Sequence, residues 1–200
     1  MPRARLPECD VESFRQRLCE IALQMFAEHG RDGVSLRALS KKMGCSHTTP
    51  YRYFNGVEEI FARVRCVCFS RFEEHLRRRL DHIEHPLEAL RELGAAYFDF
   101  AKSHPAEFEV MFAMNQPDPS LYPDSIEAGA RTWRVPLELA QRAVSQGYLC
   151  GEPEEIAHLL WSGSHGIAVL DLAGKFTLGK RPEELLRPQV EAVIAAYRKD

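Results

Sequence analysis

Apolar residues recur every three or four positions along most of the chain, and no long run alternates strictly between apolar and polar residues. This spacing places apolar side chains on one face of an α-helix. The first stripe predicts a helix of about sixteen residues that ends at Gly30. Its apolar positions are Phe14, Leu18, Ile21, Ala22, Met25 and Phe26. The pattern therefore predicts an all-α fold.

Two short helices are expected next. Ser35 is placed to cap a helix that carries Leu36, Leu39 and Met43 and ends at Gly44. Ser46 caps a second short helix, which runs to Phe54.

The same periodicity predicts six further helices, over residues 57–80, 86–103, 106–114, 125–146, 154–173 and 182–199. The first of them is capped either by Asn55 with Glu58 or by Gly56 with Glu59. Pro136 is expected to bend the helix over 125–146. The total is about nine helices, and the longest loop is 115–124.

Composition is that of a globular protein, with 45% hydrophobic and 28% charged residues in a chain of 200. The longest stretch without charge, 156–170, is too short and too polar to span a bilayer, so we expect no membrane partner. No apolar segment follows Arg3 and Arg5, so no signal peptide is visible and a cytoplasmic location is expected.

Charge is distributed unevenly along the chain. The net charge is −3, yet residues 1–80 carry 15 Lys and Arg against 10 Asp and Glu. Residues 81–200 carry 11 against 19, and 35–56 hold four basic residues and no acidic one. This asymmetry suggests a small module that faces phosphates, joined to an acidic body.

We find no arrangement of residues that indicates catalysis or a cofactor. The six cysteines form no CxxC pair, and we expect no metal site. The run 163–166 (Gly-Ser-His-Gly) lacks the spacing of a nucleophile elbow, so no catalytic residue is assigned.

The two short helices, joined at 44–46 and braced by the first long helix, match the plan of a helix-turn-helix motif. In this motif the second helix enters the DNA major groove by its N-terminal end. Here that end reads His47-Thr48-Thr49-Pro50-Tyr51-Arg52. Thr and His side chains can approach base edges, Tyr51 and Arg52 can reach phosphates, and Phe54 is expected to anchor the helix in the core.

Residues 11–65 resemble the DNA-binding domain of TetR-family transcriptional regulators. The resemblance rests on an ordered set of runs, 27–30, 35–40, 44–46 and 49–54. It implies an all-helical homodimer that binds a palindromic DNA operator and represses until a small molecule binds its C-terminal domain. One position departs from the pattern, because Val57 stands where the family usually has a Lys beside the phosphate backbone. We therefore expect weaker phosphate binding there.

Carried over position by position, the resemblance implies a DNA-binding set of Ser35, Arg37, Ser46, His47, Thr48, Thr49, Tyr51 and Arg52. Ser35 and Arg37 match positions near the DNA backbone, and residues 47–49 match base-facing positions. The alternative for each is an ordinary exposed helix residue.

The helix over 154–173 is apolar nearly all round, which predicts burial on several sides. Trp161, His165 and Gly166 resemble the Trp-His-Gly signature of one TetR C-terminal subclass. In such regulators the last two long helices pair with those of the partner subunit. The expected dimer interface is Gly163, Ile167, Leu186, Val190, Val193, Ile194 and Tyr197.

Aromatic and Met residues gather in the middle helices and near Trp161. They fit either core packing or a mostly apolar effector pocket, whose candidates are Phe98, Phe108, Met111, Phe112, Trp133, Trp161 and His165. For His165 a core position is the alternative to an effector contact. No cationic clamp is evident, which disfavours a phosphorylated ligand.

The sequence thus predicts a helix-turn-helix DNA-binding domain over 1–56 and an effector-binding and dimerisation domain over 57–200. The alternative is an orphan helical ligand-binding protein that keeps the fold without specific DNA recognition, and the acidic net charge and Val57 favour it. A small helical enzyme is a more distant alternative.

Overall fold

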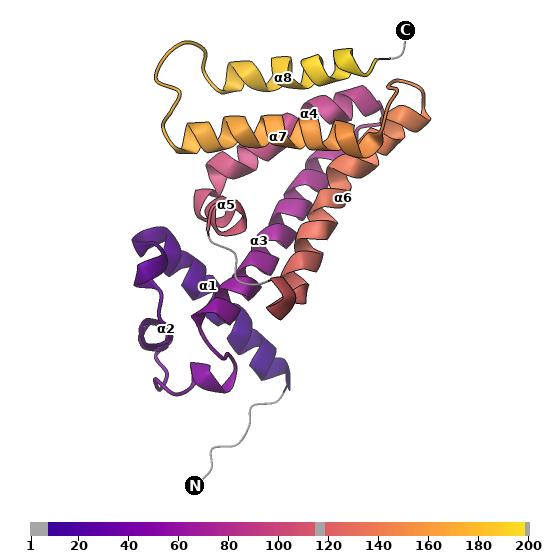
Figure 1. Ribbon diagram of the computed structural model, residues 1–200. Coiled ribbons are helices and arrows are strands. Elements are labelled where there is room, and N and C mark those ends of the chain that lie inside the picture. The colour runs from indigo at the N-terminus through magenta and orange to yellow at the C-terminus, as the bar shows by residue number, and fades with distance from the viewer. Residues whose placement is uncertain (1–7, 115–118, 199–200) are drawn as a thin grey trace. The chain divides into compact units, whose positions relative to one another are not determined.

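The computed structural model describes residues 8–114 and 119–198, and α-helices make up most of them (Figure 1). The α-helices are α1 (Glu8–His29), α2 (Leu36–Met43), α3 (Val57–Leu80), α4 (Pro86–Ser103), α5 (Pro105–Phe112), α6 (Pro123–Ser145), α7 (Pro153–Leu172) and α8 (Glu183–Ala196). Short 3-10 helices are η1 (Arg31–Gly33), η2 (Pro50–Arg52) and η3 (Pro119–Leu121). The prediction of an all-α fold is confirmed.

Packing divides the chain into two compact units. The first consists of residues 1–68 and 109–127, and the second of residues 69–108 and 128–200. The units therefore do not divide at residue 56, since the first half of α3 packs with the N-terminal helices. The functional division into 1–56 and 57–200 stays a prediction.

The first unit is built on an apolar core that α1, α2 and the start of α3 share. Leu18, Leu39 and Phe61 are fully buried, and the rings of Phe26 and Phe61 meet edge to face with centroids 5.7 Å apart. Helix α1 ends where the sequence predicts, because Gly30 adopts a left-handed φ of 69° that other residues rarely take. It begins earlier than the apolar stripe does.

The second unit has α4, α7 and α8 packed on one another. Gly94 on α4 permits this close approach, because a Cβ there would lie 3.1 Å from Val190 Cγ2 and 3.3 Å from Ser164 Oγ. The C-terminal end of α8 is tied back by a hydrogen bond of 2.7 Å from Cys150 N to Tyr197 O. Figure 1 shows α7 and α8 running side by side.

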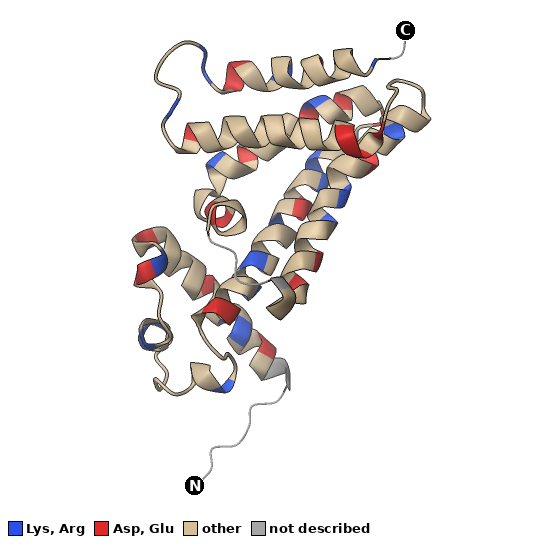
Figure 2. Ribbon diagram, viewed as in Figure 1, with Lys and Arg blue, Asp and Glu red and all other residues tan. Residues whose placement is uncertain are grey.

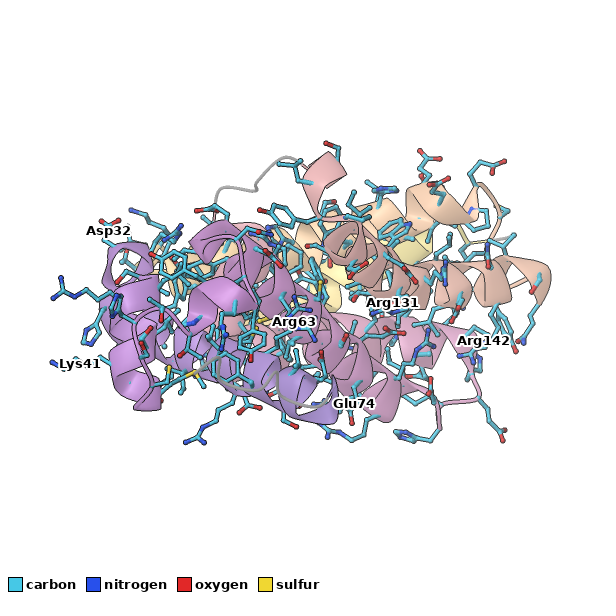
Figure 3. All side chains as sticks on the ribbon, turned by 90° about the horizontal axis from the view of Figure 1, so that it is seen from below. Asp32, Lys41, Arg63, Glu74, Arg131 and Arg142 are labelled. Carbon is cyan, nitrogen blue, oxygen red and sulfur yellow. The ribbon has the colours of Figure 1, made fainter. Side chains whose placement is uncertain are left out.

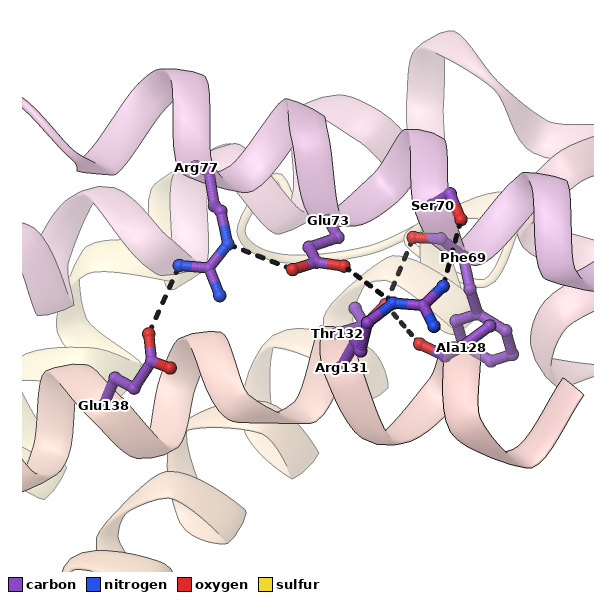
Figure 4. A network of polar contacts seen from close by, with 8 residues as sticks. All are labelled: Phe69, Ser70, Glu73, Arg77, Ala128, Arg131, Thr132 and Glu138. Carbon is purple, nitrogen blue, oxygen red and sulfur yellow. Dashed lines mark hydrogen bonds and ion pairs between the residues drawn. The ribbon is translucent and has the colours of Figure 1, made fainter. Parts of the chain in front are cut away.

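A polar network joins the second half of α3 to α6 (Figure 4). Glu73 accepts a hydrogen bond of 3.0 Å from Arg77 Nε and pairs with Arg131 at 3.7 Å. Arg77 continues to Glu138 at 3.2 Å. Thr132 Oγ1 lies 3.1 Å from the carbonyl oxygen of Phe69. Glu73 is therefore the carboxylate that holds two arginines from different helices.

The expected count of nine helices becomes eight α-helices among the described residues. The difference is the helix expected over 46–54, where only η2 forms. Two helices contain an internal proline, Pro136 in α6 and Pro188 in α8. Of the expected loop 115–124, residues 115–118 lie outside the described residues, and η3 and the start of α6 occupy the rest. No helix in the described ranges is long and apolar enough to cross a membrane.

We expect Glu73→Gln to destabilise the protein by about 1–2 kcal/mol, because Arg77 and Arg131 then face each other without the carboxylate between them. Glu138→Gln is the matched control. Its side chain is 53% exposed against 19% for Glu73, so its loss should cost within about 0.5 kcal/mol. Urea unfolding followed by circular dichroism measures both. Equal losses would contradict the central role of Glu73.

Candidate nucleic-acid interface

Helix α2 is capped at both ends as its sequence predicts. Ser35 has extended backbone, and its Oγ accepts a hydrogen bond of 3.2 Å from Ala38 N. At the other end Gly44 takes a left-handed φ of 67°, and Cys45 N donates to Ser40 O at 3.0 Å. These caps give the chain a sharp turn directly after α2.

The segment 46–54, which we call the recognition segment, forms a turn followed by η2 rather than the expected helix. Ser46 O accepts a hydrogen bond from Thr49 N at 2.9 Å, and Ser46 Oγ lies 3.5 Å from Thr48 N. An α-helix would need a bond from the N–H of residue 50 to the carbonyl oxygen of Ser46, and Pro50 has no N–H to donate. The next bond instead joins residues three apart, from Arg52 N to Thr49 O. The predicted helical run is corrected to this tighter turn.

Helix α1 holds the recognition segment in place. Arg15 Nη2 donates to Tyr53 O at 2.8 Å, and its guanidinium carbon lies 5.3 Å from the centre of the Phe54 ring. Phe14 packs on Tyr53 with ring centroids 4.8 Å apart, and Phe54 is buried as expected of a core anchor. The sequence did not single out Arg15, because its contact with Tyr53 spans 38 positions of the chain.

The predicted DNA-binding side chains lie on the surface of the first unit. Ser35, Arg37, Ser46, His47, Thr48, Tyr51 and Arg52 are exposed and Thr49 is partly exposed. Tyr51 is 63% exposed, so its ring and hydroxyl are accessible to a binding partner. The exposed groups can donate and accept hydrogen bonds and carry positive charge, which suits a polyanion.

Basic residues add to this surface. Figure 2 shows the Lys and Arg positions of α2 in blue, and in Figure 3 the side chain of Lys41 extends away from the ribbon. Lys42 is paired with Glu28 at 3.5 Å, so it contributes less free charge. The positive field of α2 therefore comes mainly from Arg37 and Lys41.

The first turn of α3 is acidic instead. Asn55 N donates to Glu59 Oε2 at 2.8 Å, which makes Glu59 the acid that caps the helix. Glu58 pairs with Arg31, and Val57 is half-buried. Carboxylates at the helix N-terminus satisfy the helix dipole but repel phosphates, so this turn offers little attraction to a DNA backbone.

In the second unit, Tyr97 is the centre of a polar and aromatic cluster. Its hydroxyl shares a hydrogen bond of 2.7 Å with His165 Nδ1, and Phe108 stacks on His165 with centroids 5.6 Å apart. Burial raises the pKa of the Tyr97 hydroxyl, and a hydrogen bond with Trp161 offsets only part of this rise. Burial lowers the pKa of His165, which favours the neutral imidazole beside the Tyr97 hydroxyl.

This cluster continues toward the surface through Trp133 and His158. Their ring centroids lie 4.2 Å apart, and Trp133 meets Trp161 edge to face at 6.0 Å. The structure therefore brings together four of the predicted ligand residues, namely Phe108, Trp133, Trp161 and His165. Tyr97 and His158 complete the group. Tyr97 belongs to the aromatic residues expected to gather in the middle helices but was not among the ligand candidates, and His158 was missed although it lies three positions before Trp161 on α7.

The remaining ligand candidates have other surroundings. Phe98 is buried, and Lys102 Nζ lies 5.2 Å from the centre of its ring. Met111 and Phe112 belong to the first unit, so they are not grouped with His165 by packing.

The expected dimer residues fall into a buried group and a partly exposed group. Val190 and Ile194 are buried within the chain, where α8 packs on α4 and α7, and are corrected to core residues. Ile167 is nearly buried, and a Cβ at Gly163 would lie 2.1 Å from Gln189 Nε2, so both serve packing inside the unit. Leu186, Val193 and Tyr197 are half-exposed. The apolar side chains that α7 exposes are Leu159, Trp161, Val169, Leu170 and Leu172.

Two family models match the chain. The model of bacterial regulatory proteins of the tetR family matches residues 18–64, which include α2 and the recognition segment. The model of the tetracyclin repressor-like C-terminal domain matches residues 90–193.

Individual proteins are similar at lower levels of identity. The transcriptional repressor KstR2 of Mycobacterium tuberculosis is 25% identical over 143 residues, which cover 69% of this chain and 70% of KstR2. A solved structure of a protein of unknown function from Rhodococcus sp. RHA1 has a TM-score of 0.84 at 23% identity, with both chains fully covered. The fatty acid degradation regulator FadR from Bacillus halodurans has a TM-score of 0.72 at 15% identity, over 96% of this chain and 97% of FadR.

We expect Val57→Lys to strengthen binding to every DNA sequence, because the added cation at the start of α3 would contact a DNA phosphate where Glu58 and Glu59 otherwise repel the backbone. The plot of log affinity against log salt concentration should steepen by about 0.9 for each protomer, the effect of one added phosphate contact. Leu178→Lys is the matched control, since Leu178 is 89% exposed in the loop between α7 and α8. An unchanged slope in Val57→Lys would contradict a DNA backbone near α3.

Proposed function

The chain belongs to the TetR family of DNA-binding transcriptional regulators, and we propose that it is a homodimeric repressor that a small, mostly apolar effector releases from a palindromic operator. As a regulator of DNA it would act in the cytoplasm. The observation that carries this proposal is the exposed recognition segment behind the capped α2. Of the eight candidate DNA contacts, six in this segment and two at the start of α2, seven are exposed on a unit where Arg37 and Lys41 supply positive charge, and the eighth, Thr49, is partly exposed.

The proposed roles follow from side-chain chemistry. His47, Thr48 and Thr49 would read base edges, and Arg52 and Tyr51 would contact phosphates or bases. Ser35, Ser46 and Arg37 would lie near the backbone. In a dimer, two such segments about 34–36 Å apart would meet successive major grooves, which is why the operator would be palindromic.

The effector would bind around the cluster of Tyr97, Trp161 and His165 in the second unit. Rings and a few polar groups are what a small-ligand site requires. The names of two similar proteins support a mostly apolar effector, since one regulates fatty acid degradation and a solved structure calls KstR2 a ketosteroid regulator. The effector would act by favouring a protein conformation with lower DNA affinity.

The dimer would form on the outer face of α7 together with α8. Leu159, Val169 and Leu170 expose apolar surface there, and Ala192, Ala195 and Ala196 on α8 are exposed and small enough for close helix approach. Large exposed apolar surfaces mark protein contacts. A twofold pairing would bury the same face on both subunits.

An orphan ligand-binding protein is the second candidate, favoured by Val57 and the acidic residues Glu58 and Glu59. Selection of bound sequences from random DNA by the purified protein decides between the two. Enrichment of a palindrome supports the repressor, and enrichment of no sequence supports the orphan protein.

Thr49→Ala and Tyr51→Phe should affect DNA binding differently. Loss of a base contact at Thr49 should relax the preference at one position of each half-site, by about 1–3 kcal/mol. Loss of the Tyr51 hydroxyl should weaken all sequences alike, because phosphates carry no sequence information. Titrations against the selected operator and its single-base variants measure both. Equal, sequence-independent losses would refute base contact by Thr49.

Leu170→Glu should convert the dimer to monomers and abolish operator binding. An unpaired carboxylate buried in an apolar contact costs about 3–5 kcal/mol, which raises the dimer dissociation constant more than about 100-fold. Leu170 is 47% exposed, so the substitution leaves the fold of the protomer intact. Leu178→Glu, in the loop after α7, is the control. A wild-type protein that sediments as a monomer at micromolar concentration would refute the interface.

A further inference from the structure

Arg65 on α3 is buried, with 2% of its surface exposed. Its Nε donates a hydrogen bond of 3.0 Å to the carbonyl oxygen of Val110, near the end of α5. Both residues belong to the first unit. An arginine this deeply buried is rare unless its charge is paired.

The charge of Arg65 is not paired within the described ranges 8–114 and 119–198. No carboxylate there forms an ion pair with it, and its enclosed Nη2 has no hydrogen-bond acceptor. Burial lowers the pKa of Arg65, and Cys66, Cys68 and Glu58 act against that shift. The guanidinium nevertheless stays protonated at physiological pH. A cation therefore lies in the core with one backbone carbonyl as its acceptor.

The bond to Val110 alone does not account for an arginine. A neutral amide side chain could donate to that carbonyl without a buried charge. The guanidinium adds a positive charge and a second N–H group, which together match the two oxygens of a carboxylate or phosphate.

Apolar residues flank Arg65 on both helices. Phe61, Val64 and Cys68 on α3 are buried, and so are Val110 and Met111 on α5. An anion that reached Arg65 would leave the rest of its molecule among apolar side chains. We propose that Arg65 is an anion site of its own in the first unit, apart from the Tyr97 cluster, and that a small organic carboxylate or phosphate ester with an apolar body acts on the repressor there. This inference rests on the proposed effector-released repressor.

Binding at Arg65 must rearrange the protein, because Nη2 is enclosed. The anion reaches it only when the Arg65 side chain or the last turn of α5 moves, which loosens the bond to Val110. Arg65 lies eight residues after the start of α3, about 12 Å along the helix. The recognition segment ends just before that start, so a shift of α3 here acts directly on the DNA-binding side chains.

Thermal unfolding of the full chain without DNA tests the anion site. The probes are hexanoate and hexyl phosphate, with 1-hexanol as the neutral analogue. An anion at ten times its Kd should raise the Tm by about 3–6 °C, and 1-hexanol should not. A larger shift with hexanoate assigns a carboxylate, and a larger shift with hexyl phosphate assigns a phosphate ester.

Two variants and one control locate the site. Arg65→Met should lose the anion-dependent shift, and Arg65→Gln, which keeps a donor for Val110, should lose it too if Arg65→Met does not fold. Arg63→Met, on the same helix but paired with Glu12 at the surface, should keep the shift. The inference is overturned if 1-hexanol matches the anions, if Arg65→Gln keeps the shift, or if neither anion shifts the Tm at about 10 mM, well above a millimolar Kd.

Operator binding separates this inference from the proposed function. If random DNA yields a palindrome but the anions bind without Arg65 or not at all, the anion site alone fails. If the anions bind through Arg65 but no DNA sequence is selected, the repressor fails. With an operator in hand, the anion should weaken DNA binding in the wild type, and DNA should weaken anion binding by the same factor. An operator affinity unchanged by a saturating anion would overturn the effector role of Arg65.

Discussion

Helix α3 has to bury apolar side chains in two separate cores, and the rest of the structure depends on this. Its first half places Ile60 and Phe61 in the first unit, and its second half places Phe72 and Leu76 in the second. A buried aromatic or aliphatic side chain contributes about 1.5–3 kcal/mol relative to an exposed one, so each half is strongly held. Because one helix supplies side chains to both cores, a movement of α3 in one core also moves the side chains that it supplies to the other core. A single helix is therefore a physical route by which a bound effector can change DNA affinity.

The recognition segment is held differently, by contacts with α1 rather than by its own hydrogen bonds. Its few backbone bonds are those of a turn and of η2 with one further bond from Phe54 N to Pro50 O, and so short a run cannot fix a side chain as well as a longer helix does. Arg15 and Phe14 supply the missing restraint through Tyr53, and Phe54 anchors the end of the segment. Because turns have low local stability, DNA binding has room to order this segment further.

Local rules predicted the helix ends, and long-range contacts explain what those rules missed. Ser35, Gly30 and Gly44 have roles that follow from side-chain length and backbone freedom, so their sequence context suffices. Val190 and Ile194 were assigned to a partner subunit because periodicity identifies an apolar face but not what covers it. Arg65 was overlooked for a related reason, since an arginine among apolar residues is ordinarily expected to reach solvent. The DNA-binding and ligand roles of individual residues remain predictions.

The acidic start of α3 has a consequence for specificity. Phosphate contacts provide most of the affinity for non-specific DNA, whereas base contacts separate one sequence from another. Glu58 and Glu59 stabilise the N-terminal end of α3, where Glu58 pairs with Arg31 and Glu59 accepts a hydrogen bond from Asn55 N. Their negative charges also reduce the attraction of this turn to the DNA backbone. A protein with a net charge of −3 and such a turn should bind non-specific DNA weakly. Since the operator and the competing genomic sites are bound through the same phosphate term, reducing that term weakens both alike, and the ratio of specific to non-specific binding is left to the base contacts of the recognition segment.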